Sequence, residues 1–487
     1  MSPEKLSELR RRWLAVIVLC AAQVMIILDQ NIVNVALPAI REDLDFSASN
    51  LVWTINAYVI PFGGLLLLAG RLGDLLSRKY VFVAGLALFT AASAWCGFAD
   101  GQTSLLVARF VQGLGGAVTS AGLLGMVVTI FSDPKPQAKA LGAFGFASAG
   151  GGAAGTVVGG VLTEGLSWHW VFWINIPLGI IVGALALRLL RNDRGIGWRA
   201  GADVFGAVLV TSGLMLVVYA LVGTESRGWA SPVTIGLGAA AVALLAGFFV
   251  RQAKAANPLL PLRILRSRNV AGANLIQALM VAALFGFMFY TVLYMQEVLS
   301  YRPLSAGLAF LPVPIVIAVV SMTVAPKLLL RFGPRTLILA GLPLLAFGLW
   351  LLSRVPVDGD YYLHLLPAMV IMPFGFGITM PSLMSLAMSE VAAEDSGVTS
   401  GLFNTTQQVG GAIGLAVVST AVAARIDSTL ADGGDKAQAL TDGYGLGFGL
   451  GAAFVAVAWL VALTVLRQRA KPEAAGSDEP AVAAAVS

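Results

Sequence analysis

The chain has 487 residues, of which 58% are hydrophobic and only 12% are charged. A soluble chain carries roughly 25% charged residues, so the composition argues strongly against a soluble protein and predicts a polytopic membrane protein. The two cysteines lie in apolar runs and there are only two histidines. We therefore expect no disulfide framework, no metal site and no cofactor.

Fourteen apolar segments are long enough to cross a bilayer core, which takes about 20 residues of helix. Loops at equivalent places in the first six and last six segments are weakly alike. The pattern predicts an all-α integral membrane protein with two pseudo-symmetric six-helix bundles and two inserted helices. The segments are 13–38, 50–69, 80–98, 104–126, 138–162, 170–190, 203–222, 232–250, 269–295, 304–326, 336–353, 361–384, 399–424 and 443–466.

The distribution of lysine and arginine sets the expected orientation. With the N-terminus inside, 24 of the 31 basic residues fall in cytoplasmic segments and six in outer loops. This bias accounts for the isoelectric point of about 9.3 without a nucleic-acid partner. The expected parts are a cytoplasmic N-terminus (1–12), an N-terminal bundle (13–190), two inserted helices with inner linkers (191–268), a C-terminal bundle (269–466) and a disordered cytoplasmic tail (467–487).

Two charged residues lie a turn or more inside the predicted spans of the first half. Asp29 is the only acid deep within a span, and Arg109 lies at a compatible depth in the fourth. Burial favours the neutral form of an acid and a nearby guanidinium favours the charged form, so this pair predicts a proton-coupling site. The alternative is a static buried pair that only fixes packing.

Polar and aromatic side chains in several spans predict a largely apolar cavity for amphipathic organic molecules. Each aromatic residue, taken alone, is more often a packing residue or an interface anchor. The expected lining is Gln30, Asn34, Trp53, Tyr58, Gln112, Gln277, Tyr290, Phe403, Asn404, Gln407 and Gln408.

The fifth span carries glycines at four-residue spacing, which lets helix backbones approach closely. The residues concerned are Gly151, Gly155, Gly159 and the adjacent Gly160. Such a surface serves either as tight static packing or as the contact along which the two halves rock. Both interpretations stay open on the sequence alone.

Several segments together resemble the fourteen-helix drug:proton antiporter branch of the major facilitator superfamily. The resemblance covers about residues 13–466. It rests on LDQNIVNVALPAI (28–40), GRLGDLLSRK (70–79), RFVQGLGGA (109–117), WHWVFWINIPLG (168–179), NPLLPL (257–262), YMQEVLSYRPLSAGLAFLP (294–312) and SGLFNTTQQVGGAIG (400–414).

The resemblance assigns roles to two of these motifs. RFVQGLGGA is similar to a motif linked to proton coupling, and Gly70, Asp74, Arg78 and Lys79 match a cytoplasmic gate motif. At this position an acid such as Asp74 can cap a helix or pair with a basic neighbour, and the alternative is a solvated charge cluster. One departure concerns the antiporter motif of the fifth span, where Thr156 stands in place of proline.

These patterns favour a transporter of the bacterial cytoplasmic membrane, not an enzyme. The expected function is proton-coupled export of amphipathic drugs by alternating access, by a monomer with both termini cytoplasmic. Its partners would be the cargo, protons and membrane lipid. A lipid or fatty-acid translocator and a proton-coupled uptake system remain alternatives on the same fold. A membrane enzyme or receptor is disfavoured because the sequence shows no nucleophile–base pair, metal-ligand set or phosphate-binding loop.

Overall fold

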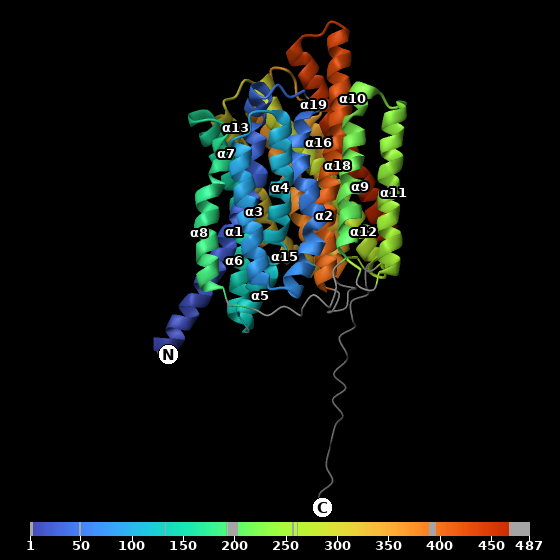
Figure 1. Cartoon of the computed structure of the whole chain (residues 1–487). Coiled ribbons are helices and arrows are strands. Elements are labelled where there is room, and N and C mark those ends of the chain that lie inside the picture. Colours follow the sequence, from blue (N-terminus) through green and yellow to red (C-terminus); the bar gives the residue numbers. More distant parts are fainter. Residues whose placement is uncertain are drawn as a thin grey trace, which may run out of the picture.

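The computed structural model describes residues 3–47, 50–131, 133–190, 192, 203–255, 258–260, 262–388 and 396–466. Within these ranges the regular structure is helical, and long helices run side by side to form one bundle (Figure 1). The predicted all-α fold is confirmed. The predicted tail at 467–487 and most of the inner linker at 191–202 lie outside the described residues.

The described residues of the first half form eight α-helices and the short 3-10 helix η1 (Asn50–Val52). The α-helices are α1 (Pro3–Asp43), α2 (Trp53–Leu75), α3 (Arg78–Gly97), α4 (Gln102–Ser120), α5 (Leu123–Ile130), α6 (Pro134–Gly165), α7 (Trp170–Trp173) and α8 (Asn175–Leu189). We call the end of the bundle at which α1 begins the lower end and the opposite end the upper end, as they stand in Figure 1.

The inserted segment and the second half follow. The inserted helices are α9 (Val204–Val222), the short α10 (Thr224–Arg227) and α11 (Pro232–Lys254). The second half has η3 (Ile264–Arg266), α12 (Arg268–Leu293), the π-helical turn η4 (Tyr294–Val298), α13 (Pro303–Phe310), α14 (Pro312–Val319), the π-helical turn η5 (Val320–Val324), α15 (Ala325–Phe332), α16 (Pro334–Leu352), the π-helical turn η6 (Tyr361–Leu365), α17 (Leu366–Met388), α18 (Ser396–Ala431) and α19 (Lys436–Val465).

Helix starts follow local sequence chemistry. Ser267 and Asp435 accept a hydrogen bond from the backbone N–H three residues on, at 3.3 Å and 2.7 Å, and so cap α12 and α19. Proline stands in the first turn of α6, α11 and α16, where its missing N–H is not needed. Gly333, with φ of 77°, makes the tight turn into α16 that other residues rarely adopt.

Twelve helical stretches among the described residues are long and apolar enough to cross a membrane. They correspond to twelve of the fourteen predicted segments. The other two predicted segments, 50–69 and 138–162, lie in helices α2 and α6. The membrane fold is therefore confirmed, whereas the count of fourteen spans remains a prediction.

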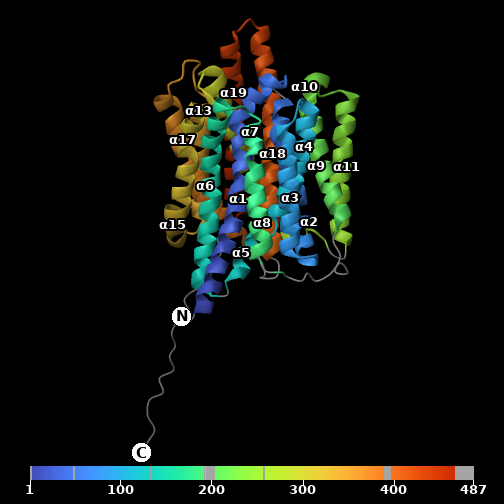
Figure 2. The same ribbon diagram turned by 60° about the vertical axis from the view of Figure 1, so that its left-hand side comes forward.

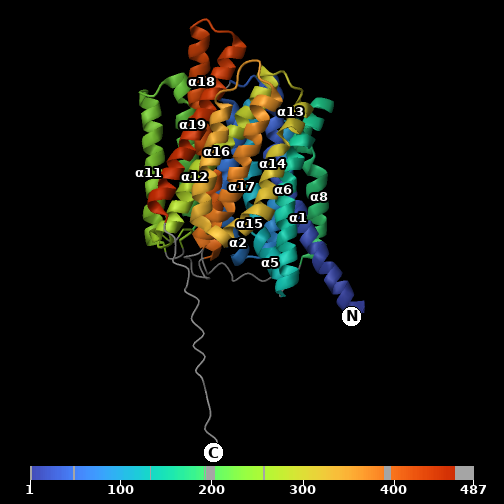
Figure 3. The ribbon, with the colours of Figure 1, turned by 180° about the vertical axis from the view of Figure 1, so that it is seen from behind.

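The two halves repeat the same packing. In the first half α1 packs on α6 and α3 on α4; in the second half α12 packs on α18 and α16 on α17. The halves meet along two seams, where α2 contacts α18 and where α6 contacts α13 and α14. Figure 3 shows the second-half helices α16 and α17 from behind. This repetition is what two related six-helix bundles require.

The inserted helices stand at the edge of the bundle (Figure 2). Helix α9 packs on α11 and also on α2 and α18, and therefore touches both halves. Thr420 of α18 donates a hydrogen bond to the Leu221 carbonyl of α9 at 3.2 Å. At the lower end Asp203 caps α9 and accepts bonds from Arg251 and Gln252 of α11, which ties the two inserted helices together.

Candidate functional site

The structure brings Asp29 and Arg109 into direct contact. One guanidinium nitrogen of Arg109 donates to the Oδ2 atom of Asp29 at 2.9 Å. Both side chains are buried, since Asp29 is 0% exposed and Arg109 1%. The carboxylate therefore points into the first-half bundle, not toward the lipid.

Two amides complete the surroundings of the carboxylate. Gln112 and Asn175 donate to Asp29 Oδ1 at 2.8 Å and 2.7 Å. Gln112 also donates to the Ser93 hydroxyl at 2.7 Å and accepts a bond from Arg109 at 2.7 Å. A carboxylate that accepts several hydrogen bonds is stabilised in its charged form, which offsets part of its desolvation cost.

The Arg109 guanidinium has partners beyond Asp29. Its Nε donates to the Thr54 carbonyl of α2 at 2.9 Å. Its central carbon lies 4.4 Å from the ring centre of Tyr58 and 5.6 Å from that of Phe172. An aromatic face attracts a cation, so Arg109 can keep its charge when the carboxylate is neutral.

Close packing of α4 on α2 holds this arrangement together. A methyl group at Gly113 would come within 2.3 Å of the Tyr58 carbonyl oxygen, so the two helices touch through backbone at this point. Gly113 lies one turn after Arg109, and this close approach lets the Arg109 side chain reach the α2 backbone. The small residues of RFVQGLGGA thus have a direct structural use.

Sequence reasoning missed Asn175. It opens α8, directly after the short helix α7, and it is fully buried. An amide within the otherwise apolar run VFWINIPLG was the available signal, because a polar group in hydrocarbon needs a partner. Its Oδ1 atom has no hydrogen-bond partner among the described residues, which leaves one acceptor beside the ion pair.

The residues predicted to line a cavity differ in what their side chains contact. Gln112 and Tyr58 contact the Asp29–Arg109 pair. Asn34 bonds the backbone of its own helix, at the Gln30 carbonyl 3.2 Å away. Local bonding of this kind satisfies an amide without any ligand.

Further cavity candidates lie on α12 and α18 of the second half. Gln277 is fully buried, and neither its side-chain oxygen nor its nitrogen has a hydrogen-bond partner within the described part of the chain. Phe403 is buried and Asn404 is exposed, whereas Gln407 and Gln408 are half-buried.

Two aromatic candidates contact other rings. The Trp53 ring lies 6.3 Å from the Tyr219 ring of α9, and the Tyr290 ring is tilted against the Tyr444 ring with 5.4 Å between their centres. The substrate cavity stays a prediction.

The glycines of the fifth predicted span face α1 beside Asp29. Methyl groups at Gly151, Gly155 and Gly159 would come within 3.0, 2.9 and 2.8 Å of carbonyl oxygens of α1. These carbonyls belong to residues 24, 28 and 32, so the contact flanks Asp29. The stripe packs α6 on α1 within one half.

Gly160 and Thr156 face the other half instead. A methyl group at Gly160 would lie 2.6 Å from the Leu304 Cα of α13, and one at Gly307 would lie 2.4 Å from the Thr156 carbonyl oxygen. The contact between the halves therefore runs along a different side of α6 from the glycine stripe.

The gate motif is only partly described. Gly70 has open space around its Cα, and the side chain of Asp74 lies outside the described residues. Lys79 donates to the carbonyls of Leu187 and Leu190 at 2.8 and 2.9 Å and to the Asn192 side chain at 2.9 Å. Lys79 thus caps the lower end of α8, where a cation opposes the negative end of the helix dipole.

A further acid, Glu297, lies near the end of a spanning stretch and not deep within it, so the prediction for Asp29 is unchanged. Glu297 belongs to the stretch Arg268–Val298, which reaches three residues beyond the predicted end of that span. It accepts hydrogen bonds from Arg41 and Tyr444 at the upper end. No cluster of three or more histidine, cysteine or acidic side chains that could hold a metal ion occurs among the described residues.

A model of the Major Facilitator Superfamily matches residues 19–415. The chain belongs to this superfamily. Its likeness to solved structures agrees: a bacterial homologue of the human lysosomal transporter Spinster superposes with a TM-score of 0.69 at 16% identity, covering 95% of this chain and 99% of that one. A peptide transporter of the POT family gives a TM-score of 0.68 at 17% identity, covering 92% and 95%. The expectation of a transporter and not an enzyme is confirmed.

Curated relatives place the chain more narrowly. It is 38% identical to the puromycin resistance protein pur8 of Streptomyces alboniger, over 94% of this chain and 90% of that protein. It is also 38% identical to the cephamycin export protein CmcT of Amycolatopsis lactamdurans, over 83% and 84%. The tetracenomycin C resistance and export protein of Streptomyces glaucescens is 31% identical, over 87% and 78%. The resemblance to the drug-exporting branch is confirmed.

Proposed function

We propose that this superfamily member is a proton-coupled exporter of amphipathic, drug-like compounds in the bacterial cytoplasmic membrane. The observation that carries the proposal is the fully buried Asp29–Arg109 pair in the first-half bundle. An acid inside a membrane domain is costly and marks proton or substrate pathways in transporters. The names of the relatives, which include puromycin resistance and cephamycin export, support the cargo class.

The contacts suggest how Asp29 would act. Protonation removes the charge that Arg109 opposes, and Arg109 then keeps Gln112, the Thr54 carbonyl and the Tyr58 ring as partners. Because α6 packs by glycines on the α1 backbone around Asp29, a shift of the carboxylate would move both helices together. Proton binding would then bias the equilibrium between the two orientations of the halves.

The proposal includes the finer features expected from the sequence. These are fourteen spans, a cytoplasmic location of both termini, alternating access by the bundles 13–190 and 269–466, and a monomeric unit. The upper end would then face the outside. The segment 191–268 adds the inserted helices, and its Asp203 is engaged by three donors.

Proteoliposomes with an imposed pH gradient test the function. We expect gradient-driven, saturable movement of at least one of puromycin, a cephamycin or tetracenomycin C, with protons moving in the opposite direction. Asp29→Asn should abolish this coupled movement, and Glu8→Gln, in an exposed pair with Arg12, should leave it unchanged. Undiminished transport by Asp29→Asn would refute the coupling role. Movement of fluorescent lipid, with none of the drugs, would favour the lipid alternative.

A further inference from the structure

The hydrogen bonds around Asp29 are bonds that a charged carboxylate accepts. Oδ2 takes one from Arg109 at 2.9 Å. Oδ1 takes one each from Gln112 and Asn175, at 2.8 and 2.7 Å. A protonated carboxylic acid needs the opposite arrangement, because its O–H group donates and requires an acceptor. A buried hydroxyl without an acceptor is costly, so one neighbour must change its role when Asp29 takes up a proton.

Two of the three neighbours are unsuited to accept. The Arg109 guanidinium carries donors only. Gln112 has an acceptor, its Oε1 atom, but Arg109 donates to it at 2.7 Å and the Cys96 thiol at 3.6 Å. The Gln112 amide nitrogen also donates to the Ser93 hydroxyl at 2.7 Å. Turning the Gln112 amide would therefore break these three contacts in addition to its bond with Asp29.

The amide of Asn175 has no such ties. Its Nδ2 atom donates to Asp29, whereas its Oδ1 atom is buried and has no hydrogen-bond partner among the described residues. The oxygen and nitrogen of a side-chain amide are nearly equal in size, so a half turn about the Cβ–Cγ bond exchanges them within the same space. The turned amide presents Oδ1 to the acid and leaves Nδ2 unpaired instead. Because either orientation leaves one amide atom unpaired, the exchange itself costs little.

The start of α8 fixes the backbone of Asn175. This residue is the first of α8 and is fully buried. Helix α8 packs on α1 and α3. On the preceding short helix α7, the ring of Phe172 lies 5.6 Å from the Arg109 guanidinium. The corner between α7 and α8 thus contacts both members of the ion pair, and the amide is the part of Asn175 that can turn.

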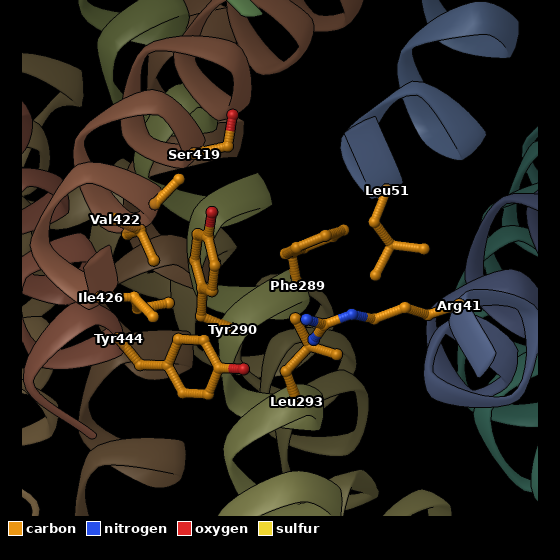
Figure 4. Close-up of a pocket in the computed structure, with 10 residues that line it drawn as sticks. Arg41, Leu51, Phe289, Tyr290, Leu293, Ser419, Val422, Ile426 and Tyr444 are labelled. Atoms are coloured by element: carbon orange, nitrogen blue, oxygen red, sulfur yellow. The ribbon is translucent and has the colours of Figure 1, made fainter. Parts of the chain in front are cut away.

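A bound water is the other kind of acceptor for a protonated acid. A small pocket of about 10 Å³, close to the space that one water molecule needs, lies at the upper end. Arg41, Tyr290 and Tyr444 are among the residues that line it (Figure 4). Arg41 follows Asp29 by twelve residues of α1, which is about 18 Å along a helix. Water in that pocket is too distant to bind Asp29, so the Asn175 amide is the acceptor at hand.

The other titratable groups around the ion pair do not compete with Asp29. They are Tyr58 of α2, whose ring faces Arg109, and Cys96 of α3, which donates to Gln112. A phenol and a thiol ordinarily ionise only at alkaline pH, and a guanidinium stays charged throughout. Helix α6 presents glycines to this part of α1. Asp29 is therefore the group whose protonation the amide senses as the pH falls.

We propose that Asn175 positions the proton on Asp29 by turning its side-chain amide. In the charged state, Nδ2 of Asn175 donates to Oδ1 of Asp29. When a proton binds to that oxygen, the amide turns and its own Oδ1 atom accepts a hydrogen bond from the new O–H group. Loss of the proton reverses the turn. The inference rests on the proposed function, since it takes Asp29 to bind a proton, but the turn can be measured without any cargo.

Infrared difference spectroscopy of the full chain in lipid bilayers provides the test. Asparagine is labelled with carbon-13 at its side-chain carbonyl, and spectra are compared between about pH 9 and about pH 4, a wide range around the titration of carboxyl groups. Bands that disappear in Asp29→Asn belong to Asp29 and to groups that respond to it. Should Asp29→Asn not fold, the double variant Asp29→Asn/Arg109→Gln, which removes both charges, takes its place.

We expect the carboxyl band of protonated Asp29 to appear together with a shift of one labelled amide carbonyl to lower frequency. A carbonyl stretch falls in frequency when its oxygen gains a hydrogen bond. Asn175→Leu should abolish the amide shift and move the Asp29 carboxyl band to higher frequency, because the O–H group loses its acceptor. Asn175→Ser serves should Asn175→Leu not fold. It removes the labelled carbonyl but keeps a hydroxyl, so it should abolish the amide shift and move the carboxyl band less.

A matched control comes from Asn274 on α12. It is also buried with an unpaired Oδ1 atom, but its Nδ2 atom donates to the Val270 carbonyl of its own helix at 2.8 Å. Asn274→Leu should therefore keep the amide shift.

The possible outcomes separate the inference from the proposed function. An amide band that stays in place while Asp29 takes up its proton, or a shift that persists in Asn175→Leu, would overturn the inference and leave the coupling role of Asp29 untouched. Absence of an Asp29 carboxyl band over the whole range would overturn both. An Asn175-dependent shift in a protein that moves none of the drugs would leave the inference standing and refute the exporter function alone.

Discussion

Replacing Asp29 by asparagine should destabilise the protein strongly, because it leaves a buried cation without its counter-ion. Arg109 is 1% exposed, and its other acceptors are the Gln112 side chain and the Thr54 carbonyl, both uncharged. Removing one partner of a buried pair costs about 3–5 kcal/mol. Arg109→Gln should cost a similar amount, since it leaves a buried carboxylate with only amide donors.

The double variant Asp29→Asn/Arg109→Gln removes both charges, so its cost should be smaller than the sum of the two. We expect the two substitutions to couple by about 2–3 kcal/mol. Unfolding of the detergent-purified protein, followed by tryptophan fluorescence, measures all four corners of the cycle. The same cycle on the exposed pair Glu8 and Arg12 serves as a control and should couple by less than about 1 kcal/mol. Additive costs at Asp29 and Arg109 would refute the argument that the pair is mutually stabilising.

Three further predictions concern packing, capping and pH. Gly155→Val should lower the unfolding temperature and the proton-linked transport rate, because the added Cβ would lie 2.9 Å from the α1 backbone. Gly150→Val should change neither, because nothing lies within 4 Å of a Cβ at that position. Lys79→Met should lower stability by about 1–3 kcal/mol in the same unfolding assay, since the α8 carbonyls lose their donor, and Lys139→Met, at an exposed position, should not. Burial alone would raise the pKa of Asp203, but hydrogen bonds from Arg251, the α9 backbone and a neighbouring amide lower that pKa overall. Ionised Asp203 should therefore stabilise the protein at neutral pH, and this stabilisation should fade below about pH 4. Equal stability of Asp203→Asn and wild type at pH 7 would contradict this prediction.

The sequence predicted the membrane fold well because its signals are strong and local. Runs of about 20 apolar residues separated by charged loops leave little choice but spanning helices. The ion pair was also accessible, since Asp29 and Arg109 are conspicuous in apolar surroundings. Their contact required only that two helices of one half lie side by side.

Other parts of the site depend on tertiary placement that no local pattern encodes. Glu297 was placed outside its predicted span because a π-helical turn continues the helix beyond the apolar run. Gln112 was assigned to a cavity because hydropathy cannot distinguish a side chain facing a partner helix from one facing water. The glycine stripe was read correctly as a close contact, but which helix it touches follows from the arrangement of the bundle.

The position of α9 gives the molecule two unlike flanks. On one flank α2, α9 and α18 form a three-helix wall, tied by the bond from Thr420 to the α9 backbone. On the other flank α6 meets α13 and α14 directly. A hydrophobic compound dissolved in the bilayer therefore meets the three-helix wall of α2, α9 and α18 on one flank. On the other flank it meets only the contact of α6 with α13 and α14. Such a compound would accordingly pass between the lipid and the protein interior mainly on the flank of α6.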